Sequence, residues 1–338
     1  MTASTPHPDG RRGTTPQFFD IPVAVPAGSG AVRASALARG ESRESRETNT
    51  PGLSSPSSAP RRGPGGRVGA RQLARFRDSL SERDWLVIHR IAEHRYLTSA
   101  QAEGFVFTGH ASQESGARVC RRVLARLHHE GLIRPLARRV GGVRAGSSAT
   151  VWQLAPAGFR LLSDHAEGLR TYEPSPRFLG HCLAVADAHL VARSLTGLGD
   201  IQHVSVQVEP LSWRRYTGIG GENRWLQPDL YLEITGSDKE GAFEDRSFVE
   251  IDMGTESLTT LIGKCEQYEV YRRAGTEQGG QRAFPRVLWF MHGERGPERA
   301  DRLVQAIRRR SGLIPGMFTV CLPEGLSDVL GGATGERV

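Results

Sequence analysis

The order of hydrophobic patterns in the second half of the chain restricts its fold more than any other feature of the sequence. Apolar residues recur there first at helical spacing, then in three short strand-like runs, and then alternate between helix and strand. The helical runs cover about 178–195, 257–273 and 297–310, and the strand-like runs cover 201–209, 227–234, 247–252, 286–291 and 316–322. Three strands enclosed by two helices predict an α/β domain with a mixed sheet.

The first half predicts a different arrangement, in which three short helices are followed by a hairpin. Ser81 and Asp84 resemble a capping box at the start of the first helix, and Gly131 suits the left-handed position after the third. The second helix covers about 99–107 and the third about 112–129, and strand-like runs at 132–140 and 149–154 enclose a glycine-rich loop. This order is typical of a winged helix-turn-helix with the hairpin as its wing.

Arginines gather on the outer side of the third helix and on the wing. The helix carries Arg118, Arg121, Arg122 and Arg126, and the wing carries Arg138, Arg139 and Arg144. Because arginine reads guanine edges in the major groove and binds backbone phosphates, we predict that these residues bind DNA. The alternative interpretations are a solvated amphipathic helix, or a winged helix that binds protein.

Composition and charge divide the chain further. Residues 1–75 are rich in Pro, Gly, Ser, Thr and Arg and poor in large apolar side chains, which predicts a disordered basic tail. The winged-helix DNA-binding domain is expected at 80–170, the mixed-sheet domain at 176–325, and a flexible tail at 326–338. Basic residues exceed acidic ones by eleven over 1–170, whereas acidic residues exceed basic ones by four over 171–338. This asymmetry favours a first half that binds a polyanion and a second half that holds metal or performs chemistry.

The sequence also predicts the cellular compartment of the protein. No stretch is apolar for long enough to span a bilayer, and the N-terminus does not resemble a secretory signal. Four cysteines are scattered singly, without a Cys-x-x-Cys pair for zinc or redox chemistry. We therefore predict a cytoplasmic protein with reduced cysteines and no membrane partner.

Lys264 stands out because only two of the forty-four basic side chains are lysines. A lysine has a tunable pKa, whereas an arginine stays protonated, so a rare lysine is a candidate for chemistry. It follows Asp229 and Glu250, which lie on neighbouring strand-like runs. Two such carboxylates can share Mg²⁺ or Mn²⁺, and a nearby lysine can stabilise developing charge. The alternative is a lysine on a solvated helix face.

Asp252 and His181 each permit more than one interpretation. Asp252 lies two residues after Glu250 on the same strand face, so it can line the same pocket, cap the turn through Gly254 or pair with an arginine. His181 and Asp187 lie among apolar residues of a predicted helix. A single histidine in that setting is more often a satisfied core residue than a ligand, and we predict a core role.

The spacing of these residues resembles a known superfamily. Pro228-Asp229, Glu250-x-Asp252, Lys264 and Gln267-x-x-x-Tyr271 resemble the PD-(D/E)xK nucleases, with Asp252 at the usual lysine position and the lysine moved to the following helix. The run from Phe248 to Ser257, with Lys264, Tyr268 and the upstream Glu209, is similar to the replication-relaxation family of plasmids and integrative elements. The resemblance implies catalytic roles for Asp229, Glu250, Lys264, Gln267 and Tyr271, and metal binding by Asp229, Glu250 and Glu209.

The function that this resemblance implies is the nicking or relaxation of double-stranded DNA by metal-dependent phosphodiester hydrolysis, during plasmid replication or transfer. Replication or conjugation proteins are the other expected partners, and the oligomeric state is left open. The alternative is a catalytically inactive nuclease fold that serves as a replication accessory or transcriptional regulator. A covalent tyrosine relaxase acting through Tyr268 or Tyr271 is disfavoured, because His181, His189 and His203 lack metal-site spacing.

Overall fold

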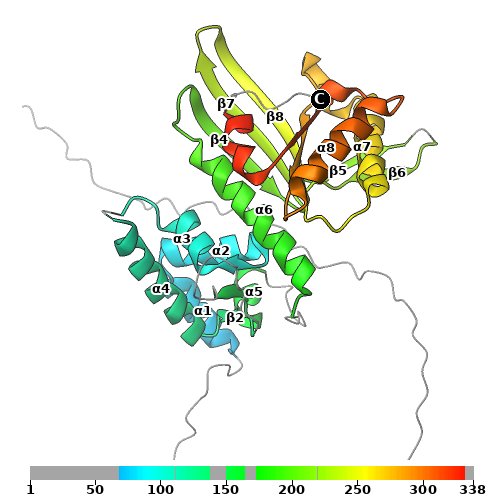
Figure 1. Cartoon of the computed structure of the whole chain (residues 1–338). Helices are drawn as coiled ribbons and strands as arrows, with labels where there is room; N and C mark the ends of the chain where they lie inside the picture. Colours follow the sequence, from blue (N-terminus) through cyan, green and yellow to red (C-terminus); the bar gives the residue numbers. More distant parts are fainter. Residues whose placement is uncertain (1–67, 111, 138–149, 164–172, 219, 332–338) are drawn as a thin grey trace, which may run out of the picture. The chain divides into compact units, whose positions relative to one another are not determined.

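The computed structural model describes residues 68–110, 112–137, 150–163, 173–218 and 220–331 (Figure 1). All of them belong to one compact unit, residues 43–338. The predicted tail over 1–67 and the arginines Arg138, Arg139 and Arg144 lie outside the described residues, as do 332–338.

The first part of the described chain consists of short helices and a small sheet. Its elements are α1 (Ala70–Ser79), α2 (Glu82–His94), β1 (Leu97–Thr98), α3 (Ser99–Val106), α4 (Gln113–His129), β2 (Ile133–Pro135), β3 (Val151–Leu154) and α5 (Pro156–Leu162). The predicted capping box of α2 is present, with Ser81 and Asp84 bonding to each other's backbone amides. Gly131 follows α4 with φ 75°, as its position predicts. The strands pair antiparallel in the order β1-β3-β2.

The second part has the predicted mixed sheet. Its elements are α6 (Pro176–Ser194), β4 (Ile201–Val208), β5 (Arg214–Thr217), β6 (Asn223–Leu226), β7 (Leu230–Asp238), β8 (Gly241–Asp252), α7 (Leu258–Arg273), β9 (Arg286–Met291), α8 (Gly296–Arg309), β10 (Phe318–Cys321) and α9 (Leu326–Leu330), with short 3₁₀ turns η1 (Thr276–Gln281), η2 (Pro315–Met317) and η3 (Pro323–Gly325). The strand order is β10-β9-β8-β7-β4. The pairs β4–β7 and β7–β8 are antiparallel, whereas β8–β9 and β9–β10 are parallel. The mixed α/β arrangement is therefore confirmed.

Helices cover both faces of this sheet (Figure 1). Val249 and Ile251 of β8 pack in a core with residues of α6 and α9, whereas Phe248 packs with residues of α7 and α8. Because side chains alternate along a strand, Glu250 and Asp252 lie on the same face as Phe248. The sheet thus presents Glu250 and Asp252 to α7 and α8.

Helix α6 is apolar over most of its surface and packs in two cores at once. Ala186 belongs to the core of the first part, whereas Val185 and Ala192 belong to the core beside the sheet. A helix with apolar side chains on more than one side is stable only when neighbouring elements cover those sides. The packing of α6 therefore joins the helical part to the sheet. Among the described residues, no helix has the length and apolar character needed to cross a membrane.

Two helices occupy segments for which the sequence predicted disorder. Helix α1 begins at Ala70, inside the predicted tail, and buries Leu73 in the first core. Helix α9 lies in the predicted C-terminal flexible tail, and its Leu326, Val329 and Leu330 pack in the core with α6. Both predictions were wrong for these residues. Each helix is short, so its few apolar residues give little periodic signal until the rest of the fold supplies a surface to cover.

A hairpin, β5–β6, lies between the predicted strand-like runs 201–209 and 227–234, where the sequence analysis placed no strand. Its strands pair antiparallel, with Tyr216 opposite Arg224 and Arg215 opposite Trp225. Tyr216 and Leu226 are buried and belong to the core shared with α7. The runs are only four residues long, and each mixes arginines with apolar side chains, which hides the strand alternation.

Arg126, predicted to bind DNA, forms an ion pair within the helical part. Its guanidinium bonds the carboxylate of Asp84, whose side chain is 1% exposed, and lies 3.8 Å from Glu130. Asp84 accepts hydrogen bonds from Ser81 as well. The pair therefore links α4 to the first turn of α2, and the buried carboxylate depends on it for compensation of its charge.

We expect Arg126→Ala to lower the free energy of unfolding by about 2 kcal/mol, because it leaves a buried carboxylate without its cation. Arg122→Ala removes an exposed arginine from the same helix and should change that free energy by no more than about 0.5 kcal/mol. Urea denaturation followed by circular dichroism measures both. Equal effects of the two variants would show that the Asp84 pair adds nothing to stability.

Candidate functional site

Asp229 lies between β6 and β7, where the chain enters the sheet. Its amide donates to the Val249 carbonyl at 3.0 Å, which sets it beside the end of β8. One carboxylate oxygen accepts a hydrogen bond from the Ile251 amide at 2.7 Å, and the other lies 3.0 Å from Nε2 of His181 on α6. Backbone pairing and a histidine therefore fix this carboxylate next to Glu250.

Glu250 is the most buried carboxylate of the site, with a side chain that is 5% exposed. The Tyr268 hydroxyl donates to Oε1 at 2.7 Å, and the Lys264 ammonium donates to Oε2 at 3.3 Å. Burial, and then the charge of Asp229, raise the pKa of Glu250 to about 7. The Asp229 carboxylate thus lies close enough to oppose the ionisation of Glu250.

Lys264 lies on α7 between two carboxylates. Its Nζ is 3.3 Å from Glu250 and 3.2 Å from Glu256, and it lies 5.8 Å from the centre of the Trp289 ring. Burial opposes the charge of this ammonium, but the charges of Glu250 and Glu256 outweigh it and raise the Lys264 pKa. The lysine therefore remains a cation, so it can stabilise negative charge but is poorly suited to act as a base.

Asp252 does not join these residues. It accepts from the Gly254 amide at 3.1 Å and pairs with Arg299 of α8 at 2.6 Å. Arg299 also donates to the Glu256 carbonyl at 2.9 Å. Both alternatives considered for Asp252, a turn cap and an arginine pair, are therefore realised together. They order the turn that leads from β8 to α7 and so to Lys264.

The helix motif residues Gln267 and Tyr271 lie away from Glu250. Gln267 is exposed, whereas Tyr271 is buried and its hydroxyl donates to Glu277 at 2.8 Å. Tyr271 is two turns beyond Lys264, about 10 Å along the axis, so it shares the helix face but not the site. Tyr268, one turn beyond Lys264, is the tyrosine that reaches Glu250.

Glu209, predicted as a third metal ligand, pairs with Arg95. Its amide donates to the Asp229 carbonyl at 3.3 Å, so its backbone lies beside the site. Arg95 follows α2 with φ 66°, a value rare for a residue with a side chain, and its guanidinium lies 5.8 Å from the centre of the Phe178 ring. The carboxylate of Glu209 is thus held by the helical part of the chain.

The sequence prediction gave no site role to His181 or Glu256, and it assigned the motif tyrosine to Tyr271. Tyr268 could have been found from its spacing of four residues from Lys264, which places both on one helix face. Glu256 lies in the Gly-Thr-Glu run that was noted for its resemblance alone. His181 was interpreted as a core residue, and only its contact with Asp229 distinguishes it from one. Burial opposes its protonation, but Asp229 outweighs this effect and raises its pKa.

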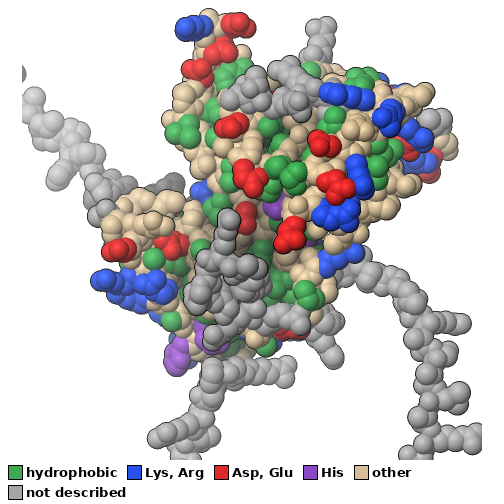
Figure 2. Space-filling view, in the orientation of Figure 1, with side chains coloured by type: hydrophobic (Ala, Val, Ile, Leu, Met, Phe, Trp, Pro, Cys, Tyr) green, Lys and Arg blue, Asp and Glu red, His purple; other side chains and the backbone are tan. Residues whose placement is uncertain are grey.

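The arginines of α4 differ in their surroundings. Arg118, Arg121 and Arg122 are exposed, whereas Arg126 is engaged by Asp84. Figure 2 shows Lys and Arg side chains gathered over the region of α4. The exposed arginines therefore form a basic surface, which we call the α4 basic face and define as Arg118, Arg121 and Arg122.

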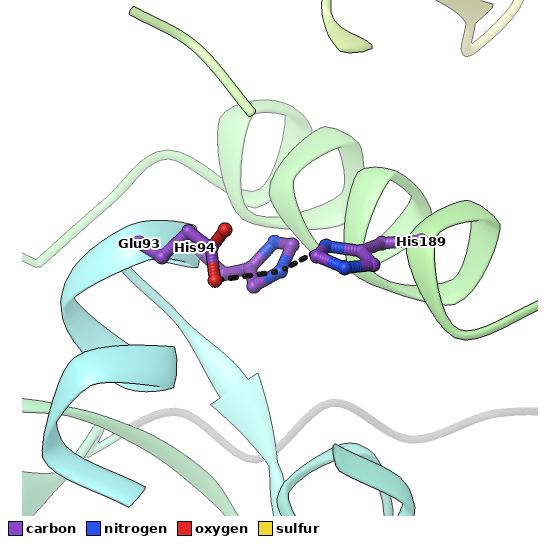
Figure 3. A group of neighbouring side chains, drawn as sticks. All are labelled: Glu93, His94 and His189. Carbon is purple, nitrogen blue, oxygen red and sulfur yellow. Dashed lines mark hydrogen bonds and ion pairs between the residues drawn. The ribbon is translucent and has the colours of Figure 1, made fainter. Parts of the chain in front are cut away.

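A second group of side chains lies where α2 meets α6 (Figure 3). His94 Nε2 is 3.1 Å from His189 Nδ1 and 4.0 Å from Glu93. These three ligand atoms are close enough together to hold a metal ion. Arg90, however, bonds Glu93 at 2.6 Å, and both Arg90 and Arg193 lie over the ring of Phe105.

Two guanidinium charges beside these histidines oppose a divalent cation. Burial and then the neighbouring charges lower the pKa of His94 to about 3 and of His189 to about 2. We therefore interpret the two rings as a neutral hydrogen-bonded pair, in which one nitrogen donates and the other accepts. The pair joins α2 to α6 as part of the buried core.

Comparisons with known proteins bear on the whole arrangement. A family model described as replication-relaxation matches residues 88–287, which include α6, the sheet strands β4, β7 and β8, and the carboxylate site residues Asp229, Glu250 and Lys264. No curated protein matches the chain. Among solved structures, the restriction endonuclease FokI is similar over 75% of this chain and 45% of that chain, with 10% identity and a TM-score of 0.25. The chain thus spans less than half of FokI, and a likeness at this score supports no argument.

The buried histidine pair predicts a specific acid sensitivity. A histidine whose pKa falls on folding contributes stability fully present above its unfolded pKa near 6.5 and lost as the pH falls below it. We expect His189→Gln, which keeps a hydrogen-bonding group but cannot titrate, to reduce the pH dependence of the unfolding free energy between pH 6.5 and 4 by about one proton. His203→Gln, at an exposed position, should leave that slope unchanged. Urea denaturation at several pH values gives the slopes, and equal slopes for wild type and His189→Gln would contradict the neutral pair.

Proposed function

Because the chain belongs to the replication-relaxation family, we propose that it binds double-stranded DNA and nicks one strand by metal-dependent hydrolysis. The observation that carries this proposal is the contact of one carboxylate, Glu250, with both Lys264 and Tyr268, next to Asp229. This set of groups matches the PD-(D/E)xK pattern, with the lysine supplied by α7. Proteins of the replication or transfer machinery of a mobile element are its proposed partners.

The residues of the site fit a divalent ion. Asp229 and Glu250 offer carboxylate oxygens, the ligands that Mg²⁺ and Mn²⁺ prefer, and each oxygen retains a lone pair beyond its present hydrogen bond. The raised pKa of Glu250 reflects its burial first and the negative charge of Asp229 second, which Lys264 offsets in part. A bound ion would polarise the scissile phosphate and lower the pKa of a water.

The surrounding residues have distinct roles in this proposal. Lys264 would stabilise the charge that develops on the phosphate, because it stays protonated between Glu250 and Glu256. Tyr268 is a positioning residue, since its hydroxyl orients Glu250 and is itself buried. His181 orients Asp229 from α6.

DNA binding is proposed for the helical part, as a winged helix. The α4 basic face supplies exposed guanidinium groups along one helix, a common way to contact phosphates and base edges in the major groove. The hairpin β2–β3 would be the wing, although its predicted arginines lie outside the described residues. Arg126 is left out of this surface because Asp84 engages it.

A second candidate function, a non-cleaving replication accessory or regulator, is favoured by one observation. Glu209, which the family resemblance places among the metal ligands, is occupied by Arg95. A site that holds its acids in internal ion pairs resembles a nuclease fold kept for binding. This candidate predicts specific DNA binding without metal-dependent cleavage.

A nicking assay on a supercoiled plasmid that carries the element's own origin distinguishes the nuclease from the non-cleaving accessory. We expect conversion to open circles with Mg²⁺ or Mn²⁺ and none with EDTA. Asp229→Asn and Glu250→Gln should each reduce the rate about 100-fold or more, because they remove charge from the proposed metal ligands. Glu240→Gln, at an exposed turn between β7 and β8, is the matched control and should nick normally. Gel electrophoresis of the plasmid forms gives the rates.

DNA binding with no cleavage in the wild-type protein would support the accessory candidate. Full cleavage by Glu250→Gln would refute the proposed site.

Salt dependence tests the DNA-binding surface. Arg121→Ala/Arg122→Ala should weaken duplex binding and reduce the slope of log K against log salt by about 2, because two phosphate contacts are lost. Arg308→Ala/Arg309→Ala removes the same charge from exposed positions on α8 and should leave the slope within about 0.5 of wild type. Fluorescence anisotropy at several salt concentrations measures both. An equal reduction in the two variants would mean that binding follows net charge and not the α4 basic face.

A further inference from the structure

The hairpin β5–β6 begins and ends beside the carboxylate site. Glu209 lies five residues before β5, and Asp229 lies three residues after β6. The Ser212 hydroxyl donates to the Pro228 carbonyl at 2.7 Å and ties the two ends of the hairpin together beside Asp229. Figure 1 shows the two strands next to α7. A ligand on this hairpin would therefore lie next to the proposed scissile phosphate.

One face of the hairpin is anchored to the protein. Arg214 pairs with Glu277 at 3.0 Å and lies 4.3 Å from the centre of the Tyr231 ring. Tyr216 packs against Tyr271, with ring centres 5.1 Å apart. These contacts are buried or half-buried, so they hold the hairpin in place and orient its other face outward.

The outward face, which we call the tryptophan face, carries Trp213, Arg215 and Trp225. The two indoles meet edge to face with ring centres 6.5 Å apart, and Trp225 is 55% exposed. Arg215 lies opposite Trp225 in the strand register, and Asn223 holds its guanidinium at 2.9 and 3.2 Å. The exposed Trp225 ring and the fixed guanidinium of Arg215 thus lie together, with the half-buried ring of Trp213 against Trp225.

We propose that the tryptophan face binds unpaired bases of a DNA strand beside the carboxylate site; this deepens the nicking function proposed above and rests on it. An exposed indole offers a flat face on which a base of any sequence can stack, and arginine adds a phosphate contact or a second stacking plane. Bases in a duplex are already stacked on one another, so this surface favours single-stranded or locally opened DNA. The charge is complementary, since the exposed guanidinium of Arg215 lies opposite Trp225 on the same face.

Binding in EDTA tests this inference apart from cleavage. With the full chain, we expect Trp225→Ala to weaken binding of a labelled oligothymidylate about 10-fold, while affinity for a duplex changes less than about twofold. Trp225→Phe keeps a stacking surface and should retain most of the affinity. Leu198→Ala, which removes an apolar side chain of equal exposure, 56%, is the matched control. Melting temperatures equal to wild type confirm that each variant is folded.

Intrinsic fluorescence gives an independent reading, because a stacked base quenches an indole. Oligothymidylate should quench the wild-type emission more than that of Trp225→Phe. Equal oligothymidylate affinity of wild type and Trp225→Ala would overturn the inference. So would loss of self-association in Trp225→Ala, measured by light scattering, because the face would then be covered by a second copy of the chain. Trp225-dependent binding in a protein that never nicks would refute the nuclease proposal and leave the binding face standing.

Discussion

The burial of Glu250 is the constraint on which the candidate site depends. A carboxylate with a side chain 5% exposed loses its hydration, and only nearby donors and cations can compensate. Helix α7 supplies both, through the Lys264 ammonium and the Tyr268 hydroxyl. Helix α7 must therefore begin at one position and with one rotation about its axis. The Asp252–Arg299 pair at the preceding turn fixes both. The acid at the usual lysine position thus helps to position the lysine that replaces it.

The parts of the fold that could be predicted are those with local causes. The order of strands and helices follows from hydrophobic spacing, and the boundaries of α2, α3 and α4 follow from capping side chains next to them in sequence. Partner choice could not be predicted, because it depends on tertiary distance. Lys264, Tyr268 and Tyr271 share one face of α7, yet Lys264 and Tyr268 reach Glu250 whereas Tyr271 contacts Glu277. The short elements α1, α9 and β5–β6 were not predicted for the same reason. Each has few apolar residues, and their role is evident only from the tertiary surfaces that they cover.

The arginines illustrate why composition is a weak guide to DNA binding. Arg126, Arg95 and Arg299 each neutralise a carboxylate inside the fold, and each joins two elements distant in sequence. Arginine suits this work because its planar fork stays charged and can satisfy several acceptors when partly buried. A basic excess in the sequence therefore counts structural and ligand-binding arginines together. The exposure of each arginine and its ion-pair partner distinguish the two kinds. On α4, the arginines of the α4 basic face remain as candidates to bind a polyanion.

The tryptophan face and the carboxylates are linked by the chain itself. Because β5 and β6 begin and end within a few residues of Glu209 and Asp229, a force on the hairpin acts on the backbone that positions both acids. The Ser212–Pro228 bond closes that connection at its base, and the Arg214–Glu277 pair fixes the hairpin to η1 after α7. A strand held on the hairpin would thus be held in fixed relation to Asp229 and Lys264. Placing a phosphate requires such a rigid reference, which the proposed tryptophan face would supply without reading sequence.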